Sequence, residues 1–169
     1  MTRKPLPASL LATLVLASAA ASAHDYYWEH NVSATAVCQP STPLQLGGLR
    51  QRPLGIFNNK PEAIYISCSF YTDTLGELGK DRLEVSFHNS TAAPVEVGCT
   101  AQGGSRTAGV NNYTGSVLVA AGASASLVFD PIHRRRVEGA HINLSCLLPG
   151  GVEMGRISLR QDSRANLPQ

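Results

Sequence analysis

Apolar and polar residues alternate in short stretches along most of the chain. In residues 63–70, AIYISCSF, every second residue from Ile64 onwards is apolar or cysteine, so an extended strand has one apolar and one polar face. Gly, Pro, Asn and Asp separate the stretches, and no window has a helical period. The pattern predicts nine strands, at residues 33–38, 54–58, 63–70, 83–89, 95–100, 115–120, 124–130, 141–148 and 155–160.

Many short strands joined by Gly/Pro turns are typical of an all-β protein, and we predict a single antiparallel β-sandwich of about 8–9 short strands. A barrel is the alternative. Two hairpins are predicted, one over residues 115–130 and one over residues 142–160 with Pro149, Gly150 and Gly151 at its corner. The glycine-rich residues 101–115 are predicted to form a long flexible hairpin tip, which is a common place for a binding loop.

The first 23 residues have the pattern of a secretory signal peptide. Arg3 and Lys4 precede the apolar run LLATLVLASAAA, and the small residues Ala21, Ser22 and Ala23 form a cleavage pattern. The run is shorter than a membrane span, so we expect a periplasmic or secreted protein with no transmembrane segment after cleavage. We assign residues 1–23 to the signal peptide, 24–160 to one β-sandwich domain and 161–169 to a frayed tail.

Four cysteines follow the predicted cleavage site, and an even number in an exported chain predicts two disulfides. Three pairings are possible for Cys38, Cys68, Cys99 and Cys146, of which we favour Cys38–Cys68 with Cys99–Cys146. No C-x-x-C pair occurs, which argues against a zinc ribbon or a thioredoxin-like redox site.

The charge balance limits the class of partner. Without Arg3 and Lys4 the 14 basic residues become 12, equal to the 12 acidic residues. A surface that binds nucleic acid needs a concentrated excess of Lys and Arg, so we expect no nucleic-acid partner.

Cleavage after residue 23 leaves His24 at the amino terminus, where the α-amine and the ring nitrogen can chelate a metal. One further imidazole, from His30 or from His88, His133 or His141, completes a T-shaped copper site. This arrangement resembles the histidine brace of copper-dependent polysaccharide monooxygenases and the amino-terminal histidine of small periplasmic copper-binding sandwiches. The alternative interpretation makes His24 the start of a disordered leader and predicts no cofactor.

Two further groups are candidates for binding. Tyr26, Tyr27 and Trp28 can stack on a sugar or a peptide, or they can cover one open end of the sandwich as a hydrophobic lid. Arg134, Arg135 and Arg136 form the densest positive patch, which is either a solvated loop or a contact for an anionic glycan or lipid head group.

The sequence contains no G-x-S-x-G elbow and no H-E-x-x-H motif. No arrangement of side chains in the sequence singles out a catalytic group. We therefore predict a non-enzymatic protein that binds an envelope or extracellular partner, with copper binding through His24 as the alternative.

Two resemblances bear on these expectations. Residues 31–48, NVSATAVCQPSTPLQLGG, are similar to the opening of spore-coat-U-like and other chaperone–usher pilin subunits, which implies a structural subunit as a second alternative. Residues 55–58, 66–68 and 146–149 resemble pieces of a class of uncharacterised exported proteins of Gram-negative bacteria. The second resemblance implies a disulfide-stapled β-sandwich and no particular activity.

Overall fold

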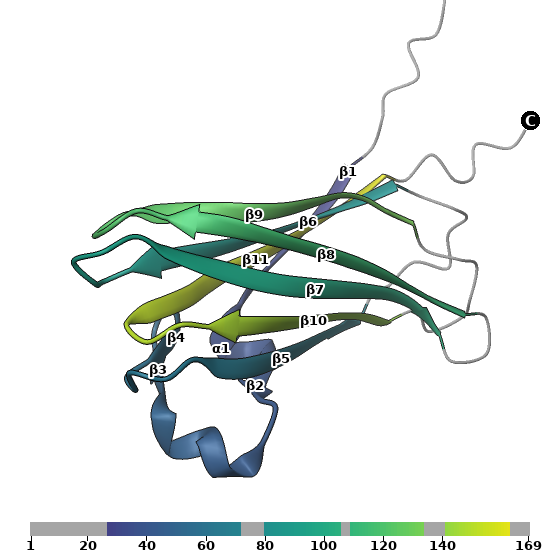
Figure 1. Ribbon diagram of the computed structural model, residues 1–169. Helices are drawn as coiled ribbons and strands as arrows, with labels where there is room; N and C mark the ends of the chain where they lie inside the picture. The colour runs from purple at the N-terminus through teal and green to yellow at the C-terminus, as the bar shows by residue number, and fades with distance from the viewer. Residues whose placement is uncertain (1–26, 72–79, 106–108, 134–140, 163–169) are drawn as a thin grey trace, which may run out of the picture.

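The computed structural model describes residues 27–71, 80–105, 109–133 and 141–162, which form two antiparallel β-sheets packed face to face (Figure 1). The predicted sandwich is confirmed, and the barrel alternative is wrong because the strands form two separate sheets. The elements of this part of the chain are β1 (Tyr27–Ser33), α1 (Ala34–Val37), β2 (Cys38–Pro40), the 3-10 helix η1 (Pro43–Gly48), β3 (Leu49–Arg52), β4 (Gly55–Asn58), β5 (Ile64–Tyr71), β6 (Lys80–Asn89), β7 (Val95–Ser105), β8 (Gly109–Val119), β9 (Ser124–His133), β10 (His141–Leu148) and β11 (Val152–Asp162).

The strand order identifies the topology as a jelly roll. The first sheet runs β3-β4-β11-β6-β9, with β1 paired to β11, and the second runs β2-β5-β10-β7-β8. From β4 onwards, successive strands cross between the sheets except at β7 and β8, which gives the two interlocked Greek keys of a jelly roll.

Both predicted hairpins are wrong. The turn that contains Gly122 (φ 65°) joins β8 to β9, and the turn that contains Gly151 (φ 77°) joins β10 to β11, but each pair of strands lies in opposite sheets. A glycine turn reverses the chain in either case, so its composition does not distinguish a hairpin from a connection that crosses the sandwich. The hairpins of the described residues are β3–β4 and β7–β8.

The predicted strand over residues 33–38 is also wrong, because residues 34–37 form the helical turn α1. The Ser33 side chain accepts a hydrogen bond from the Thr35 backbone N–H at 3.3 Å, which caps this turn. Ala34 is fully buried, so the turn brings a small side chain into the core before β2 starts at Cys38.

Several segments predicted to be loops or a leader are strands. Residues 101–105 and 109–115 extend β7 and β8, so the described parts of the predicted flexible tip belong to a long hairpin. Strand β1 pairs with β11 along its whole length, and β3, which lies before the predicted strand at residues 54–58, pairs with β4. Strand β11 continues to Asp162, two residues beyond the predicted end of the domain.

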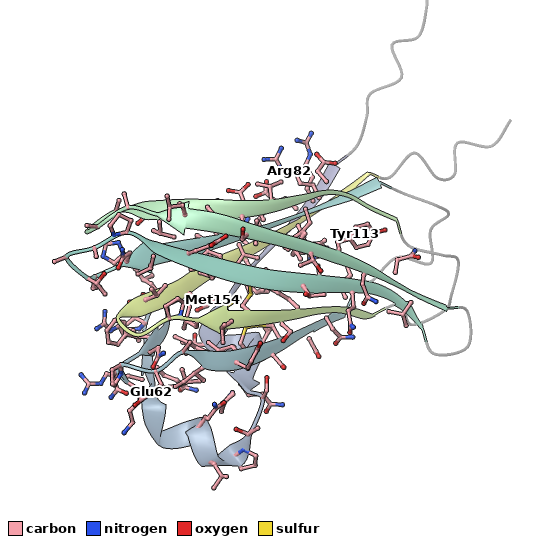
Figure 2. The ribbon with its side chains drawn as sticks, in the orientation of Figure 1. Glu62, Arg82, Tyr113 and Met154 are labelled. Atoms are coloured by element: carbon pink, nitrogen blue, oxygen red, sulfur yellow. A yellow bond between two sulfur atoms is a disulfide. The ribbon has the colours of Figure 1, made fainter. Side chains whose placement is uncertain are left out.

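The core lies between the two sheets and follows the predicted alternation. Phe87 of β6, Leu144 of β10 and Met154 of β11 are almost completely buried, and Figure 2 shows Met154 between the layers. In β9, Leu127 and Phe129 are buried, as predicted. Each buried side chain of this size contributes roughly 1.5–3 kcal/mol, so these inward positions hold the two sheets together.

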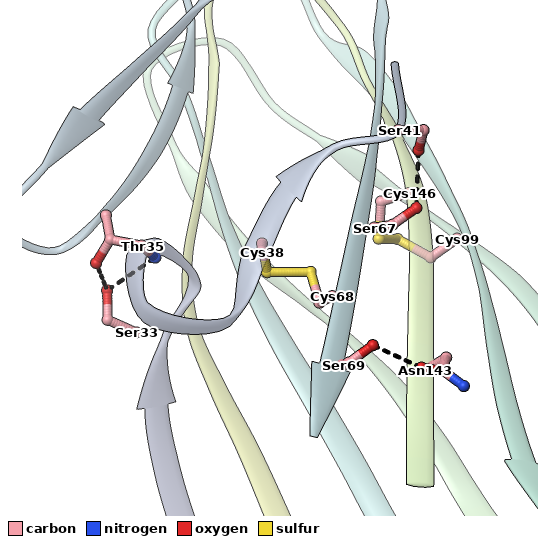
Figure 3. Close-up of a disulfide and its surroundings, with 10 residues drawn as sticks. All are labelled: Ser33, Thr35, Cys38, Ser41, Ser67, Cys68, Ser69, Cys99, Asn143 and Cys146. Carbon is pink, nitrogen blue, oxygen red and sulfur yellow. Dashed lines mark hydrogen bonds between the residues drawn. A yellow bond between two sulfur atoms is a disulfide. The ribbon is translucent and has the colours of Figure 1, made fainter. Parts of the chain in front are cut away.

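Both predicted disulfides are confirmed (Figure 3). Cys38 lies opposite Cys68 in the β2–β5 ladder, and Cys99 lies opposite Cys146 in the β7–β10 ladder. All four are buried on the inward side of the second sheet. The bonds therefore join neighbouring strands of one sheet and do not connect the two sheets.

Two fully buried asparagines connect the sheets at the ends of β4 and β6. The Asn58 amide donates to the backbone carbonyls of Glu62 (2.8 Å) and Leu148 (2.9 Å), and its oxygen accepts from the Lys60 N–H (3.0 Å). Asn89 is used in the same way, and its amide donates to the carbonyls of Ala93, Val119 and Ala120. Each asparagine thus satisfies backbone groups of a connector and of a strand end in the opposite sheet.

The two glycines with positive φ differ in their surroundings, and a matched pair of alanine variants tests this difference. A Cβ at Gly151 would lie 2.5 Å from the Thr91 Cγ2, whereas a Cβ at Gly122 would meet nothing within 4 Å. We expect Gly122→Ala to lower the free energy of unfolding by about 1 kcal/mol, from backbone conformation alone. Gly151→Ala adds a steric clash and should cost about 2–3 kcal/mol. If urea unfolding shows the same loss of unfolding free energy for Gly122→Ala and Gly151→Ala, the steric explanation for Gly151 is contradicted.

Candidate binding site

The outer faces of the two sheets differ in charge. On the first sheet, Arg52 forms an ion pair with Glu153 (2.9 Å) and its guanidinium lies 3.9 Å from the centre of the Phe57 ring. Arg82 and Glu84 form a second, longer pair at 3.5 Å. This outer face has the mixed charges of an ordinary solvated surface.

The carboxylate of Glu29 on β1 also belongs to this charged face. Hydrogen bonds from Asn31 (3.1 Å) and from Ser158 of β11 (3.0 Å) lower the pKa of the Glu29 carboxyl below its ordinary value. The Coulombic effect of Arg156 and Arg160 acts in the same direction. Glu29 therefore stays ionised to lower pH than an ordinary glutamate and contributes to the charge of the face.

The second sheet has an outer face made almost entirely of uncharged polar side chains. Among the outward residues of this sheet whose side chains the structure describes, only Glu96, near the start of β7, is acidic or basic. Apart from Val110 and Leu118 on the edge strand β8, we call the rest of this described surface the uncharged face, and it consists of Gln39, Tyr65, Ser67, Ser69, Gly98, Thr100, Gln102, Asn112, Thr114, Ser116, Asn143, Ser145 and Leu147.

Strand register arranges these side chains in rows across the sheet. The central row takes one residue from each of the five strands, in the order Gln39, Ser67, Ser145, Thr100 and Thr114. With strands about 4.8 Å apart, the row is about 19 Å long. A surface of that length has room for a ligand of several repeating units.

A second row, next to the central one, contains Ser69, Asn143, Gln102 and Asn112. Hydrogen bonds within the uncharged face orient several of its side chains. The Ser69 hydroxyl donates to the Asn143 side-chain oxygen at 2.7 Å, as Figure 3 shows. Hydroxyl and amide groups each combine donors with acceptors, so the two rows together offer both kinds of group over a wide area.

The third row combines an aromatic ring with an open position. Tyr65, 55% exposed, lies opposite Leu147, which lies opposite Gly98. A Cβ at Gly98 would meet nothing within 4 Å, so the surface is open there. An apolar side chain beside an open position allows a flat ring to lie against the sheet, and a tyrosine can contact such a ring with its face.

Most binding residues predicted from the sequence cannot be compared with this surface. Tyr26 and the arginines Arg134, Arg135 and Arg136 lie outside the described residues. The backbones of Tyr27 and Trp28 lie in β1, paired with Asp162 and Gln161, on the edge of the first sheet. The aromatic and arginine interpretations stay predictions.

The copper site also stays a prediction, because His24 lies outside the described residues. His30 lies on β1 opposite Leu159 and is exposed. Within residues 27–71, 80–105, 109–133 and 141–162, no group of three or more His, Cys, Asp or Glu side chains is placed to hold a metal ion. In the same part of the chain, no helix is long and apolar enough to cross a membrane.

The uncharged face is not predicted from the sequence, although its signal is present there. The alternation identifies the inward residues of each strand, but it does not show which outward residues of different strands become neighbours. Ser67 and Ser69 of YISCSF, Asn143 and Ser145 of INLSCL, and Thr100 of VGCTAQ all lie at outward positions. Their shared lack of charge becomes informative only when the strand order places them side by side.

In sequence, the chain matches neither a known protein family nor a curated protein. Its structure is similar to that of the carbohydrate-binding module TmCBM61 in complex with β-1,4-galactotriose (12% identity, TM-score 0.44, 78% of this chain and 86% of that chain). It is also similar to the C-terminal CBM6 of LamC from Zobellia galactanivorans (7% identity, TM-score 0.46, 78% and 98%). A third similar structure comes from infectious bursal disease virus, Gx strain (14% identity, TM-score 0.49, 97% and 39%).

Proposed function

We propose that this protein is an exported, non-enzymatic β-sandwich that binds a neutral glycan on its uncharged face. The observation that carries the proposal is the central row, in which all five strands of one sheet contribute an uncharged hydrogen-bonding side chain. The two disulfides fit an oxidising, extracytoplasmic compartment, where such glycans occur.

The chemistry of the face favours a neutral, hydroxyl-rich ligand. Sugar hydroxyls both donate and accept, as do the Ser, Thr, Asn and Gln side chains of the face. A polyanion would need Lys or Arg, and the described outward residues of this sheet include neither. Tyr65 supplies an exposed aromatic ring at one end, beside the open surface at Gly98.

The pilin-like alternative has less support. Donor-strand assembly needs a strand supplied by a neighbouring subunit. In the described part of the chain, β1 already occupies the position beside the second half of β11.

The proposal is tested by migration in native gels that contain a neutral polysaccharide, namely a galactan, a mannan, a glucan and a xylan in turn. We expect retardation in at least one of these gels. Gln102→Glu adds a charge to the uncharged face with little change in shape and should weaken retention roughly tenfold, about 1.4 kcal/mol. Gln51→Glu makes the same change at an exposed position on β3 of the other sheet and should leave retention unchanged.

A second variant separates binding from folding. Gly98→Val fills the open position beside Leu147, where a Cβ would meet no other atom within 4 Å, and valine favours a strand more than glycine does. We expect unchanged or higher stability together with weaker retention. The proposal fails if the wild type migrates freely in every neutral gel, or if Gln51→Glu weakens retention as much as Gln102→Glu does.

A further inference from the structure

Strand β8 is an edge strand without the features that normally protect an edge. It is the last strand of the second sheet and pairs only with β7 among the described strands. Its sequence, GVNNYTGSVLV, contains no charged residue and no proline over 11 residues. A long uncharged edge presents backbone N–H and C=O groups on which a further strand can pair.

The other edges of the sandwich are protected. Strand β2 has three residues and ends at Pro40, and β3 has four residues, of which Arg50 and Arg52 are charged. Strand β1 carries Glu29, and β9 carries the exposed Asp130. Short length, proline and charge are the usual means of preventing edge pairing, so β8 stands apart from the other described edges.

Among the described strands, β8 packs against the other sheet through its inward face and not through its backbone edge. Strand β8 lies next to β9 of the other sheet, where Gly115 faces inward. A Cβ at Gly115 would lie 3.3 Å from Leu127 and 3.4 Å from Phe129, both on β9. The contact with β9 therefore involves the inward face of β8, and the backbone edge points along the sheet.

The outward residues of β8 form a pattern that is complementary to itself. Val110 (48% exposed) and Leu118 (68% exposed) are its two exposed large hydrophobic residues, and they lie at equal distances from Thr114. In an antiparallel pair of two β8 strands centred on Thr114, Val110 of each copy lies opposite Leu118 of the other. Asn112 then lies opposite Ser116, so apolar residues meet apolar ones and polar residues meet polar ones.

We propose that two copies of this protein associate through β8, in antiparallel register about Thr114. About ten ladder hydrogen bonds would form between the two strands. A typical specific interface has a similar number of direct hydrogen bonds. The absence of charge on β8 means that the twofold axis brings no like charges together. Association stops at two copies because pairing consumes the unprotected edge of each.

The pairing joins the second sheet of one copy to the second sheet of the other, so that the two form one continuous sheet. The uncharged faces of both copies then lie on the same side of this sheet. A ligand long enough to cross the axis would contact both copies. This inference does not depend on the identity of that ligand, because it rests on the edge of the sheet and not on its face.

Sedimentation velocity of the purified protein tests the association. The wild type should sediment with twice the monomer mass at about 100 μM, and Val110→Lys/Leu118→Lys should sediment as a monomer, because this change places positive charges opposite each other at two positions. We expect dimerisation to weaken by at least roughly a hundredfold. Both side chains are exposed, so circular dichroism should show an unchanged fold.

The matched control is Val110→Glu/Leu118→Lys, which charges the same two positions with opposite signs. In the proposed register each new carboxylate lies opposite a new ammonium group, so this variant should remain a dimer. Three results would overturn the proposal: a monomeric wild type, an assembly larger than two copies, or the same mass for both double variants.

Discussion

Replacing Cys99 and Cys146 together with alanine should lower the free energy of unfolding by about 4 kcal/mol. The bond closes a loop with a sequence separation of 47 residues, so its loss frees many conformations of the unfolded chain. Cys99 is 3% exposed and Cys146 is fully buried, so the variant also loses two sulfur atoms from the core. The loss should appear as a lower midpoint in urea unfolding under non-reducing conditions.

Ser145→Ala is the control for this experiment, because Ser145 adjoins Cys146 on the same strand and points to the uncharged face. Its effect should stay within about 0.5 kcal/mol. Replacing Cys38 and Cys68 should cost about 3.5 kcal/mol, because their sequence separation is only 30. A loss below about 1 kcal/mol in the Cys99/Cys146 variant would show that the bond contributes far less than its loop predicts.

Asn58→Ala should lower the free energy of unfolding by about 3–4 kcal/mol. The substitution removes two donors and one acceptor and leaves the Leu148 carbonyl without its side-chain partner in the interior. It also removes the hydrogen bond that links the end of β4 to the end of β10, and these two strands belong to opposite sheets. Urea unfolding of the variant measures the cost.

The neighbouring Asn59 provides a matched control of the same residue type. Asn59 is exposed, so Asn59→Ala should change stability by less than about 0.5 kcal/mol. Similar losses in the two variants would contradict the role assigned to Asn58, and the cost would then reflect the turn as a whole.

The sequence predicts the parts of the fold that depend on local periodicity. Burial alternates with a period of two along β6, β9 and β10, so the inward positions of these strands follow from the residues alone, as at Val85, Leu127 and Ile142. The disulfide pairing agrees with the expectation because Cys38 lies opposite Cys68 and Cys99 lies opposite Cys146 in the strand ladders.

The sequence does not predict features that depend on which strands become neighbours. The turns after β8 and β10 have hairpin chemistry, yet the jelly roll places their flanking strands in different sheets. Asn58 and Asn89 lie in turn-like sequences, where asparagine is common for local reasons. Their long-range hydrogen bonds to Leu148 and Val119 become visible only in the folded chain.

The candidate site depends on neighbouring strands in the same way. No single strand shows an uncharged face, because each contributes only one to three ordinary polar residues. The central row joins Gln39, at the start of the domain, to Ser145 near its end, with Thr100 and Thr114 beyond. Without the strand order, the sequence instead indicates the aromatic cluster at residues 26–28, because these residue types are characteristic of binding sites by themselves.

The jelly-roll order also has a consequence for how fast, and in what sequence, the chain folds. Among the described strands, only β3–β4 and β7–β8 pair with a neighbour in sequence, whereas the second partners of β4 and β5 are the late strands β11 and β10. Proteins dominated by such distant pairings fold in about milliseconds to seconds. As the chain emerges from its amino terminus, Cys38 and Cys68 come together first, and Cys99 meets Cys146 only after β10 has arrived. Early in folding, Cys99 is therefore exposed to oxidants before its native partner Cys146 is in place. The Cys99–Cys146 bond, and with it oxidative folding, can be completed only after β10 has paired.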